Sequence, residues 1–268
     1  MSKVIFITGA TSGIGEAIAT FLHTKGYKVY GTGRNPAPIH EVGYSLVKLD
    51  INNQKTIDEA VGSIIQKEGR IDAIINNAGI GLAGPFEEIS TDDALEVMDT
   101  NVLGILRTSK AVLPIMRKQK SGKIINIGSI GGITGLPFRS FYCASKYATE
   151  GLSESLSMEV KQFGISVSLI QSGDMKTKIN LNRKELELES NSDYSVSYEK
   201  VRKEINDSVD KSQDPVKIAK VIHKILQSKR PKFRYRIGLP LEHFTIFVKN
   251  LVPYRLYEYL VNNHYKIN

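Results

Sequence analysis

Tyr142 and Lys146, four residues apart, form the pair in this sequence best suited to proton transfer. They open a stretch with helical apolar spacing, so both side chains would project from one helical face. A free tyrosine has a pKa of ~10, too high for efficient proton transfer at neutral pH. We expect the ammonium group of Lys146 to favour the phenolate and so to lower the tyrosine pKa. Taken alone, the pair also fits an ordinary helix surface.

A glycine-rich turn, Thr8-Gly-Ala-Thr-Ser-Gly-Ile-Gly15, follows the first apolar run. Its G-x-x-x-G-x-G spacing differs by one residue from the common dinucleotide fingerprint, but the physics is shared. Glycines allow the backbone to approach a pyrophosphate closely, and the following helix offers free N–H groups. A tight strand-to-helix turn explains the glycines equally well. The position after a first strand favours the phosphate site.

The second predicted strand ends at Gly33, and Arg34 follows directly. In dinucleotide sites a carboxylate at this place binds the adenosine ribose 2′-hydroxyl, whereas an arginine suits a 2′-phosphate. Arg34 offers bidentate hydrogen bonds, and the missing carboxylate removes a repulsion. We therefore predict NADP(H) as the cofactor, with NAD(H) less favoured.

Short apolar runs alternate with segments of helical period, which places these residues at the ends of strands. The runs lack apolar–polar alternation, as expected of parallel strands covered on both faces. The sequence predicts an α/β fold: one doubly wound, Rossmann-type parallel sheet with helices on both faces and a C-terminal helical extension. Predicted strands cover residues 4–7, 28–32, 45–49, 71–75, 123–127, 166–170 and 234–237, and predicted helices cover 14–22, 56–66, 93–106 and 141–163.

The length of 268 residues suits a single domain over residues 1–268. Within it, the charged and Ser/Asn-rich stretch 176–214 predicts a substrate lid, and residues 239–268 form the C-terminal extension. The hydrophobic share of 41% is that of an ordinary globular protein. The first apolar run is too short for a signal peptide or a transmembrane segment, so we expect a cytoplasmic location.

The composition argues against several other classes of protein. The one cysteine, Cys143, excludes a disulfide framework, and the histidines show no zinc-like pairing, so no metal is expected. The formal charge of +8 invites a nucleic-acid interpretation. No nucleic-acid-binding motif accompanies the basic cluster between Lys229 and Arg236, and a positive field also suits a phosphorylated cofactor. We expect no nucleic-acid partner.

Five motifs, in order and at similar spacings, resemble those of the short-chain dehydrogenase/reductase family in its single-domain branch. They are the turn Thr8–Gly15, Asn76-Asn-Ala-Gly79, Asn101, Ser129 and Tyr142-x-x-x-Lys146. The resemblance covers about residues 3–177 and extends more loosely towards the C-terminus. It implies an oxidoreductase that moves a hydride between a nicotinamide and a carbonyl or alcohol carbon.

The resemblance also implies a role for each matched residue. Ser129 would hold the substrate oxygen, Tyr142 would give or take its proton, and Lys146 would bind the nicotinamide ribose. Asn101 would anchor a water that connects Lys146 to solvent. The implied cofactor-binding residues are Gly9, Thr11, Ser12, Gly13, Ile14, Gly15, Arg34, Asp50, Ile51, Asn77, Ala78, Gly79, Tyr142, Lys146, Gly173 and Thr177.

Two departures from the family pattern concern the cofactor. Gln171-Ser172-Gly173 stands where Pro-Gly is common, which loosens a backbone constraint without removing a reactive group. Ser12 stands where many NADP-using relatives have Lys or Arg, so the prediction of a 2′-phosphate rests on Arg34 alone.

The substrate side is less defined by the sequence. The small apolar segment 131–138, with Phe141, Met175 and an aromatic C-terminal stretch, predicts a lipophilic ketone, aldehyde or secondary alcohol. The chain is similar here to the hydroxysteroid- and retinol-dehydrogenase-like subgroup. The aromatic stretch could pack over the cleft, join a subunit interface or touch a membrane as a peripheral contact. The resemblance implies a homodimer or homotetramer that pairs through the helices carrying Asn101 and Tyr142.

The main alternative to an enzyme is a non-catalytic NADP(H)-binding sensor or scaffold on the same fold. The chain has all four of Asn101, Ser129, Tyr142 and Lys146. This favours catalysis, because a non-catalytic sensor has no need of the complete set.

Overall fold

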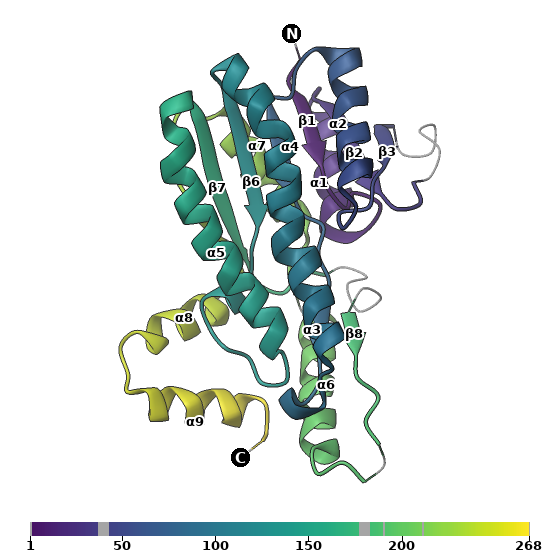
Figure 1. Ribbon diagram of the computed structural model, residues 1–268. Helices are drawn as coiled ribbons and strands as arrows, with labels where there is room; N and C mark the ends of the chain where they lie inside the picture. The colour runs from purple at the N-terminus through teal and green to yellow at the C-terminus, as the bar shows by residue number, and fades with distance from the viewer. Residues whose placement is uncertain (1, 37–42, 177–182, 190, 211, 268) are drawn as a thin grey trace.

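The structure is a computed structural model that describes the whole chain except residues 1, 37–42, 177–182, 190, 211 and 268. Seven parallel strands form one sheet in the order β3-β2-β1-β4-β6-β7-β9 (Figure 1). Their bounds are β1 Val4–Ile7, β2 Lys28–Gly33, β3 Ser45–Lys48, β4 Ala73–Asn76, β6 Gly122–Ile127, β7 Ile165–Ser172 and β9 Arg234–Ile237. The predicted doubly wound sheet is confirmed, and β1 and β9 have the predicted bounds.

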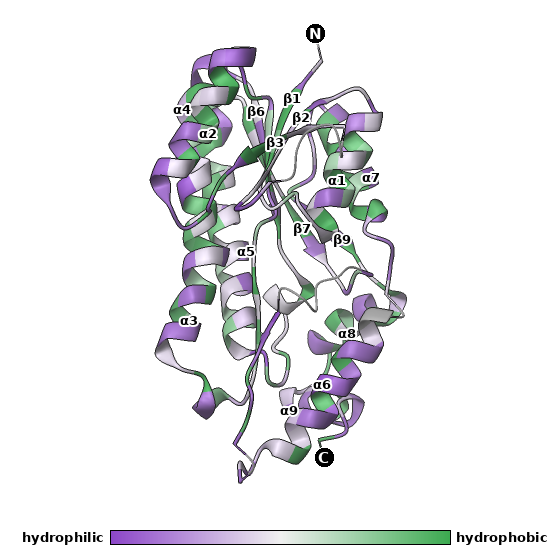
Figure 2. Cartoon of the chain, turned by 90° about the vertical axis from the view of Figure 1, so that its right-hand side faces the viewer, coloured by the Kyte–Doolittle hydropathy of each residue, from purple (hydrophilic) through white to green (hydrophobic). Residues whose placement is uncertain are grey.

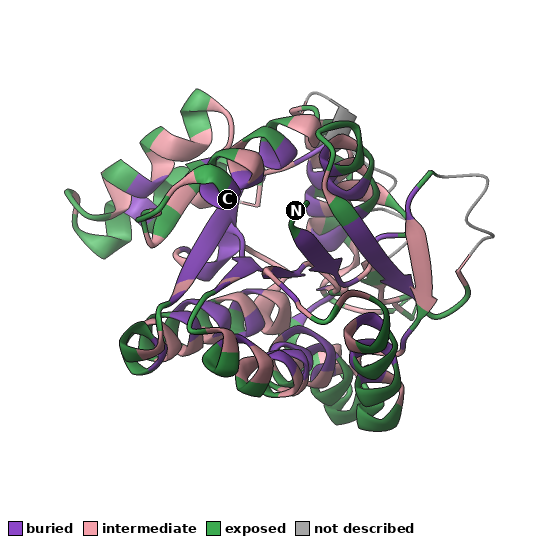
Figure 3. Ribbon diagram, turned by 90° about the horizontal axis from the view of Figure 1, so that it is seen from above, coloured by how far each residue is buried: buried purple, intermediate pink, exposed green. Residues whose placement is uncertain are grey.

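Helices cover both faces of the sheet (Figure 2). α1 (Gly13–Thr24) and α7 (Val216–Gln227) lie on one face, and α2 (Gln54–Glu68), α4 (Gly104–Gln119) and α5 (Ser140–Val160) lie on the other. Successive residues of β1 serve the two cores in turn: Ile5 packs with α1 and α7, whereas Phe6 packs with α2 and α4. Seen from above, the buried strands separate two rows of helices that are exposed on their outer sides (Figure 3).

The prediction of one continuous helix over 93–106 is wrong in detail. It contains α3 (Thr91–Met98), a widened π-type turn over Asp99–Leu103, and then α4. Apolar periodicity does not register one extra residue in a turn, so the widened turn could not be predicted from the apolar pattern.

The C-terminal third adds elements beyond the carboxyl ends of the strands (Figure 1). α6 (Ser195–Asp210) precedes α7, and α8 (Pro240–Lys249) and α9 (Tyr254–His264) follow β9. A second, two-stranded parallel sheet pairs β5 (Gly81–Ala83) with β8 (Arg183–Glu185). Short 3₁₀ turns occupy Phe86–Glu88, Ile130–Gly132 and Lys161–Phe163. None of the helices within the described parts of the chain is long and apolar enough to cross a membrane.

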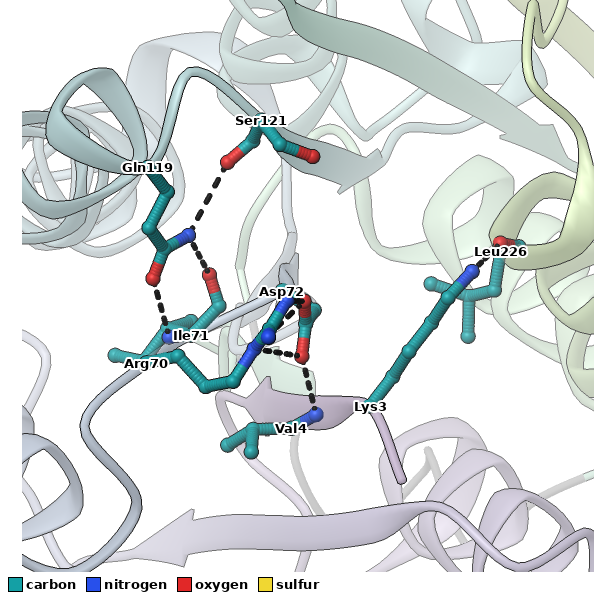
Figure 4. A network of polar contacts seen from close by, with 8 residues as sticks. All are labelled: Lys3, Val4, Arg70, Ile71, Asp72, Gln119, Ser121 and Leu226. Carbon is teal, nitrogen blue, oxygen red and sulfur yellow. Dashed lines mark hydrogen bonds and ion pairs between the residues drawn. The ribbon is translucent and has the colours of Figure 1, made fainter. Parts of the chain in front are cut away.

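The amino ends of the strands are fastened by a polar network (Figure 4). The Asp72 carboxylate accepts hydrogen bonds from the Val4 backbone N–H, at 2.8 Å, and from Arg70. The Gln119 amide donates to Ile71 O at 2.9 Å, and Lys3 Nζ donates to Leu226 O. These polar groups bind the main chain of neighbouring elements, so this end of the sheet is structural. The reactive residues lie at the opposite end.

Candidate active site

The glycine turn joins β1 to α1, and its glycines are packed so closely that they leave almost no space for a side chain. Gly9 has φ +65°, a left-handed conformation that favours glycine, and a Cβ there would lie 3.0 Å from Ala78 Cα. A Cβ on Gly15 would lie 2.1 Å from Gly9 O and 2.5 Å from Asn77 Nδ2. Both glycines are therefore needed for the turn to close against the end of β4.

Thr8 and Asn77 fasten this turn. The Thr8 hydroxyl accepts hydrogen bonds from the backbone N–H groups of Asn77 and Ala78, each at 3.0 Å. The Asn77 side chain donates to Thr8 O at 3.1 Å and to Gly9 O at 2.9 Å. Asn77, predicted as a cofactor contact, thus also holds the turn in shape. Thr8 was not among the predicted site residues, although a hydroxyl beside the first glycine was a usable signal.

The first turn of α1 is open to an anion. Ser12 occupies the N-cap position in extended conformation, and its side chain makes no capping hydrogen bond. The first N–H groups of a helix have no intrahelical partners, and they bind phosphate well. Thr32 Oγ1, at the end of β2, is buried and has no partner among the described residues. The close-packed glycines, the open helix end and this unpartnered hydroxyl fit a dinucleotide cofactor.

Gly33, the last residue of β2, packs against Thr11 of the glycine turn, and Arg34 follows it. A Cβ on Gly33 would lie 2.4 Å from Thr11 Cγ2, so the packing itself leaves no room for the carboxylate that other dinucleotide sites carry there. The Arg34 side chain is exposed at the cavity rim and forms no ion pair with any described residue. It is placed to meet an anionic group of a ligand.

Ser129 and Tyr142 meet at the centre of the cavity. Ser129 follows β6, and its Oγ accepts a hydrogen bond from Gly131 N at 3.0 Å. A Cβ on Gly131 would lie 3.3 Å from the Tyr142 ring and 3.4 Å from Ser129 Oγ, so this glycine lets the two side chains come together. Lys146 is one turn further along α5, with Nζ 5.8 Å from the centre of the Tyr142 ring and 3.1 Å from Ile127 O, to which it donates.

The pKa values differ from the sequence-based expectation. Burial raises the pKa of Tyr142, although its hydrogen bond to Ser129 and the charge of Arg139 act in the other direction. Burial also lowers the pKa of Lys146 to about 8. The net pKa of Tyr142 is therefore raised rather than lowered as expected, because the cost of removing the phenolate from water outweighs the hydrogen bond to Ser129 and the charge of Arg139.

Asn101 lies behind the cavity wall rather than on it, in the widened turn between α3 and α4. Its side chain accepts a hydrogen bond from Ile80 N at 2.8 Å and donates to Ile80 O at 2.9 Å and to Ser145 Oγ at 3.0 Å. The amide thus connects the strand-end loop to α5. Its side-chain donors and one acceptor lone pair are thus engaged by the protein itself.

The C-terminal helices close the far side of the cavity. Tyr257 hydrogen-bonds to Thr134, Tyr265 accepts from Arg139, and Lys249 Nζ donates to Ile133 O. All three contacts fall on the segment between Ser129 and Tyr142. The Glu242 carboxylate accepts from Asp174 N at 2.9 Å and fills the space beside Gly173, where a Cβ would lie 2.1 Å from it. The tail therefore supports the loop after β7, where the proline of the family pattern is missing.

One cavity of about 660 Å³ connects these groups, within the range of small-molecule sites. Ser129, Tyr142 and Lys146 line it. So do most predicted cofactor residues: Gly9, Thr11, Ser12, Gly13, Ile14, Arg34, Asp50, Ile51, Asn77, Ala78, Gly79 and Gly173. Gly15 is packed beneath the turn, and Thr177 lies outside the described residues. Cys143 is buried away from the cavity, as expected of a packing residue.

Sequence reasoning did not identify several charged residues of the cavity wall. Arg139, Asp174 and Glu242 surround the reaction centre from three separate segments. Arg139 precedes Tyr142 by three residues at the start of the same helix, which was a signal that could have been used. Asp174 and Glu242 come together only through the packing of α8, so no local sequence pattern predicts that they line the cavity.

Comparison with known proteins agrees with this geometry. The profile of the short chain dehydrogenases matches residues 3–187. A 3-ketodihydrosphingosine reductase of Bacteroides thetaiotaomicron is 39% identical over 99% of this chain and 98% of its own length. Bovine retinol dehydrogenase 8 is 33% identical over 87% of this chain and 81% of its own, and hydroxysteroid dehydrogenases also match.

The fold is likewise shared with a solved structure. A short-chain dehydrogenase from Streptomyces avermitilis superposes with a TM-score of 0.81 at 30% identity, covering 94% of this chain and 92% of that one. The family resemblance predicted from the five motifs is thus confirmed. The chain belongs to the short-chain dehydrogenase/reductase family, oxidoreductases that act on CH–OH and C=O groups with a nicotinamide cofactor.

Proposed function

We propose that this enzyme is NADP(H)-dependent and reduces or forms the carbonyl group of a lipophilic substrate, with Tyr142 as the general acid or base. The observation that carries the proposal is the meeting of Ser129 and Tyr142 in a cavity whose outer wall is largely apolar. Leu136, Met175, Leu241, Ile246 and Val261 contribute to that wall. The 3-ketodihydrosphingosine reductase and the retinol dehydrogenase bear names that point to lipophilic substrates, which supports the same assignment.

In the proposed reaction each residue has one task. A bound nicotinamide supplies or accepts the hydride. Ser129 donates a hydrogen bond to the substrate oxygen, and the Tyr142 phenol gives that oxygen a proton during reduction. Because burial raises its pKa, Tyr142 stays protonated at neutral pH, the form needed for this step. Lys146 binds the ribose hydroxyls, and Asn101 holds a water on the path from Lys146 to solvent.

The preference for NADP(H) rests on the adenosine end of the cradle. Arg34 is exposed and without an ion-pair partner among the described residues, and Thr11 excludes a carboxylate at position 33. Both features favour a 2′-phosphate. Asp50, Ile51, Asn77, Ala78 and Gly79 would line the adenosine side, and Gly173 and Thr177 the nicotinamide side.

The test is oxidation of NADPH and of NADH across a panel of steroid, retinoid, long-chain and small polar carbonyl compounds. We expect NADPH to be used with the lipophilic members. Tyr142→Phe should bind NADPH with unchanged affinity and lose turnover by at least about 10³-fold. Cofactor binding without turnover of any carbonyl compound would instead support the sensor or scaffold, and full activity of Tyr142→Phe would refute the assigned chemistry.

We also propose one domain over 1–268, with residues 176–214 as the substrate lid and 239–268 as the C-terminal extension. Glu204, Ile205 and Ser208 of α6 line the cavity, which supports the lid.

Leu106 on α4 and Met158 on α5 are exposed, which supports pairing of two or four copies through these helices. Light scattering of the wild type and of Leu106→Glu tests the pairing. The cytoplasmic location stays a prediction.

Peripheral contact with a membrane is a further part of the proposal. Leu241, Phe244, Phe247, Leu251 and Tyr254 are all exposed on or between α8 and α9. Apolar and aromatic side chains of this kind enter the lipid interface. Vesicle co-sedimentation of the wild type and of Phe244→Ser/Phe247→Ser measures it, and equal sedimentation of both proteins would contradict it.

A further inference from the structure

Arg139 places a charged group inside the substrate side of the cavity. It precedes α5 directly, three residues before Tyr142, and its side chain lines the cavity. Its Nη2 donates to the Tyr265 hydroxyl, and the guanidinium lies over the Tyr265 ring, 5.6 Å from its centre. Burial on its own would lower the pKa of Arg139, but the neighbouring Tyr265 and Asp174 outweigh it and the pKa is raised. The side chain therefore stays a cation at the cavity, half-buried as a residue and with its Nε fully buried.

Part of this cation lacks a partner. Arg139 Nε is buried and has no hydrogen-bond partner among the described residues. A guanidinium has five N–H donors, and a buried charged donor without an acceptor destabilises the folded state. Native structures rarely contain such groups without a functional reason. Because Arg139 lines the cavity, a ligand bound there can supply an acceptor to its guanidinium.

The surroundings of Arg139 restrict what that ligand atom can be. The Asp174 carboxylate also lines the cavity, interacts electrostatically with Arg139 and accepts from Ser208 Oγ at 2.8 Å. No ion pair joins Arg139 to Asp174 within the described structure, so the two charged groups do not neutralise each other by direct contact. An anionic ligand group would face the carboxylate. A hydroxyl suits both, because it accepts from a guanidinium and donates to a carboxylate.

We propose that Arg139 and Asp174 form a subsite for a hydroxyl group of the substrate, located close to the carbonyl that Ser129 and Tyr142 hold. Arg139 directly precedes α5, three residues before Tyr142, and both side chains line the same cavity, which places the subsite on the Tyr142 side of it. The substrate class is then a lipophilic hydroxyketone rather than a plain ketone. This inference rests on the proposed function and names its substrate class more closely.

A matched pair of substrates tests the inference: a long-chain methyl ketone, and the same ketone with a hydroxyl on that methyl carbon. A hydrogen bond to a charged group contributes ~1.5–3 kcal/mol, so the wild type should prefer the hydroxyketone about 10- to 100-fold in kcat/KM. Arg139→Met, which keeps an unbranched apolar stem, should lower this ratio to near one. Arg139→Lys should retain part of it.

Tyr265→Phe is the control for a merely structural role. It removes the hydroxyl that receives the Arg139 hydrogen bond but leaves Arg139 itself. If Arg139 only fastens α9, Tyr265→Phe and Arg139→Met will change the substrate ratio alike, and the inference is overturned. If Arg139 binds substrate, Tyr265→Phe keeps the preference. Should Arg139→Met not fold, judged by thermal unfolding, Arg139→Lys decides, and an unchanged ratio in it overturns the inference.

The proposed function and this inference fail in different ways. If no member of the carbonyl panel, these two ketones included, is reduced with NADPH, the proposed function is wrong, and the inference with it. If other members are reduced but the hydroxyketone is not, only the hydroxyl subsite is refuted. If both ketones are reduced equally well by the wild type, the proposed function stands and only the hydroxyl subsite is refuted.

Discussion

The cofactor side and the substrate side of the cavity are built by different means. The cofactor side consists mainly of backbone, held by close contacts between the turn after β1 and the end of β4, such as those of Thr8 with Asn77 and Ala78. The substrate side consists of side chains from α5, α6, α8 and α9, joined by single contacts such as Tyr257 with Thr134. A substitution in the packed backbone of the cofactor side must displace the main chain. A substitution on the substrate side can remove one side-chain contact and leave the others in place.

On the cofactor side, the largest effect is expected for Gly15→Ala. The new Cβ would lie 2.1 Å from Gly9 O, so the turn must shift, at a cost of about 1–3 kcal/mol of unfolding free energy. A shift of ~1 Å can reduce function about 100-fold, and we expect NADPH binding to weaken by that order. Fluorescence titration and thermal unfolding measure the two effects.

Gly62→Ala, in the middle of α2, is the matched control for Gly15→Ala. A Cβ there meets nothing within 4 Å, so this change should stabilise the protein by roughly 0.5–1 kcal/mol and leave NADPH binding alone. Equal behaviour of the two variants would contradict the close-packed cradle.

Arg34→Gln should have the next largest effect, and only on the choice of cofactor. Loss of a charged hydrogen bond at an exposed site should lower the NADPH-over-NADH preference by about 10- to 30-fold. Steady-state kinetics with both cofactors measures this ratio. Arg230→Gln, exposed before the amino end of β9, is the control and should leave the ratio unchanged. An unaltered ratio in Arg34→Gln would assign the 2′-phosphate to another residue.

The pH dependence should follow Lys146, which belongs to both sides of the cavity. Its pKa is lowered to about 8, so the ammonium is present below that pH and is lost as the pH rises through it. Since the charged form binds the ribose, kcat/KM for reduction should fall roughly tenfold between pH 7 and pH 9. Lys146→Arg keeps the charge, and its residual activity should decline only at higher pH. A flat wild-type profile up to pH 9 would exclude this role.

Tyr257→Phe should have the smallest effect, confined to the substrate side. It removes the hydrogen bond to Thr134, which contributes about 1 kcal/mol, so KM for the carbonyl substrate should rise only a few-fold. NADPH affinity should stay constant. Tyr254→Phe, whose side chain is exposed, should change neither constant. A loss of NADPH affinity in Tyr257→Phe would show that the two sides are coupled.

The two sides also differ in how far the sequence predicts them. The cofactor side follows from local patterns, because a β-branched run that ends in glycines predicts both the strand and the turn, as at Val4–Gly15. The sheet, its order of elements and the place of Tyr142 beside Ser129 follow from the same reasoning and from the family motifs.

The substrate side could not be predicted in this way. Arg139 meets Tyr265 across more than a hundred residues, and the position of Glu242 against Gly173 depends on how α8 packs. The raised pKa of Tyr142 likewise depends on burial, which is a property of the folded chain rather than of the Tyr-x-x-x-Lys spacing. The cost of removing the Tyr142 phenolate from water cannot be read from charges along the sequence.

The contacts of α8 and α9 with residues 133–139 have a consequence for biosynthesis. Every other part of the site is translated before Leu241, and domains generally begin to fold from the N-terminal side during synthesis. The residues proposed to bind the cofactor are all translated by Thr177, so the cofactor cradle can form while the segment between Ser129 and Tyr142 still lacks the helices that cover it. A nascent chain of this enzyme should be able to hold its cofactor before it can recognise its substrate.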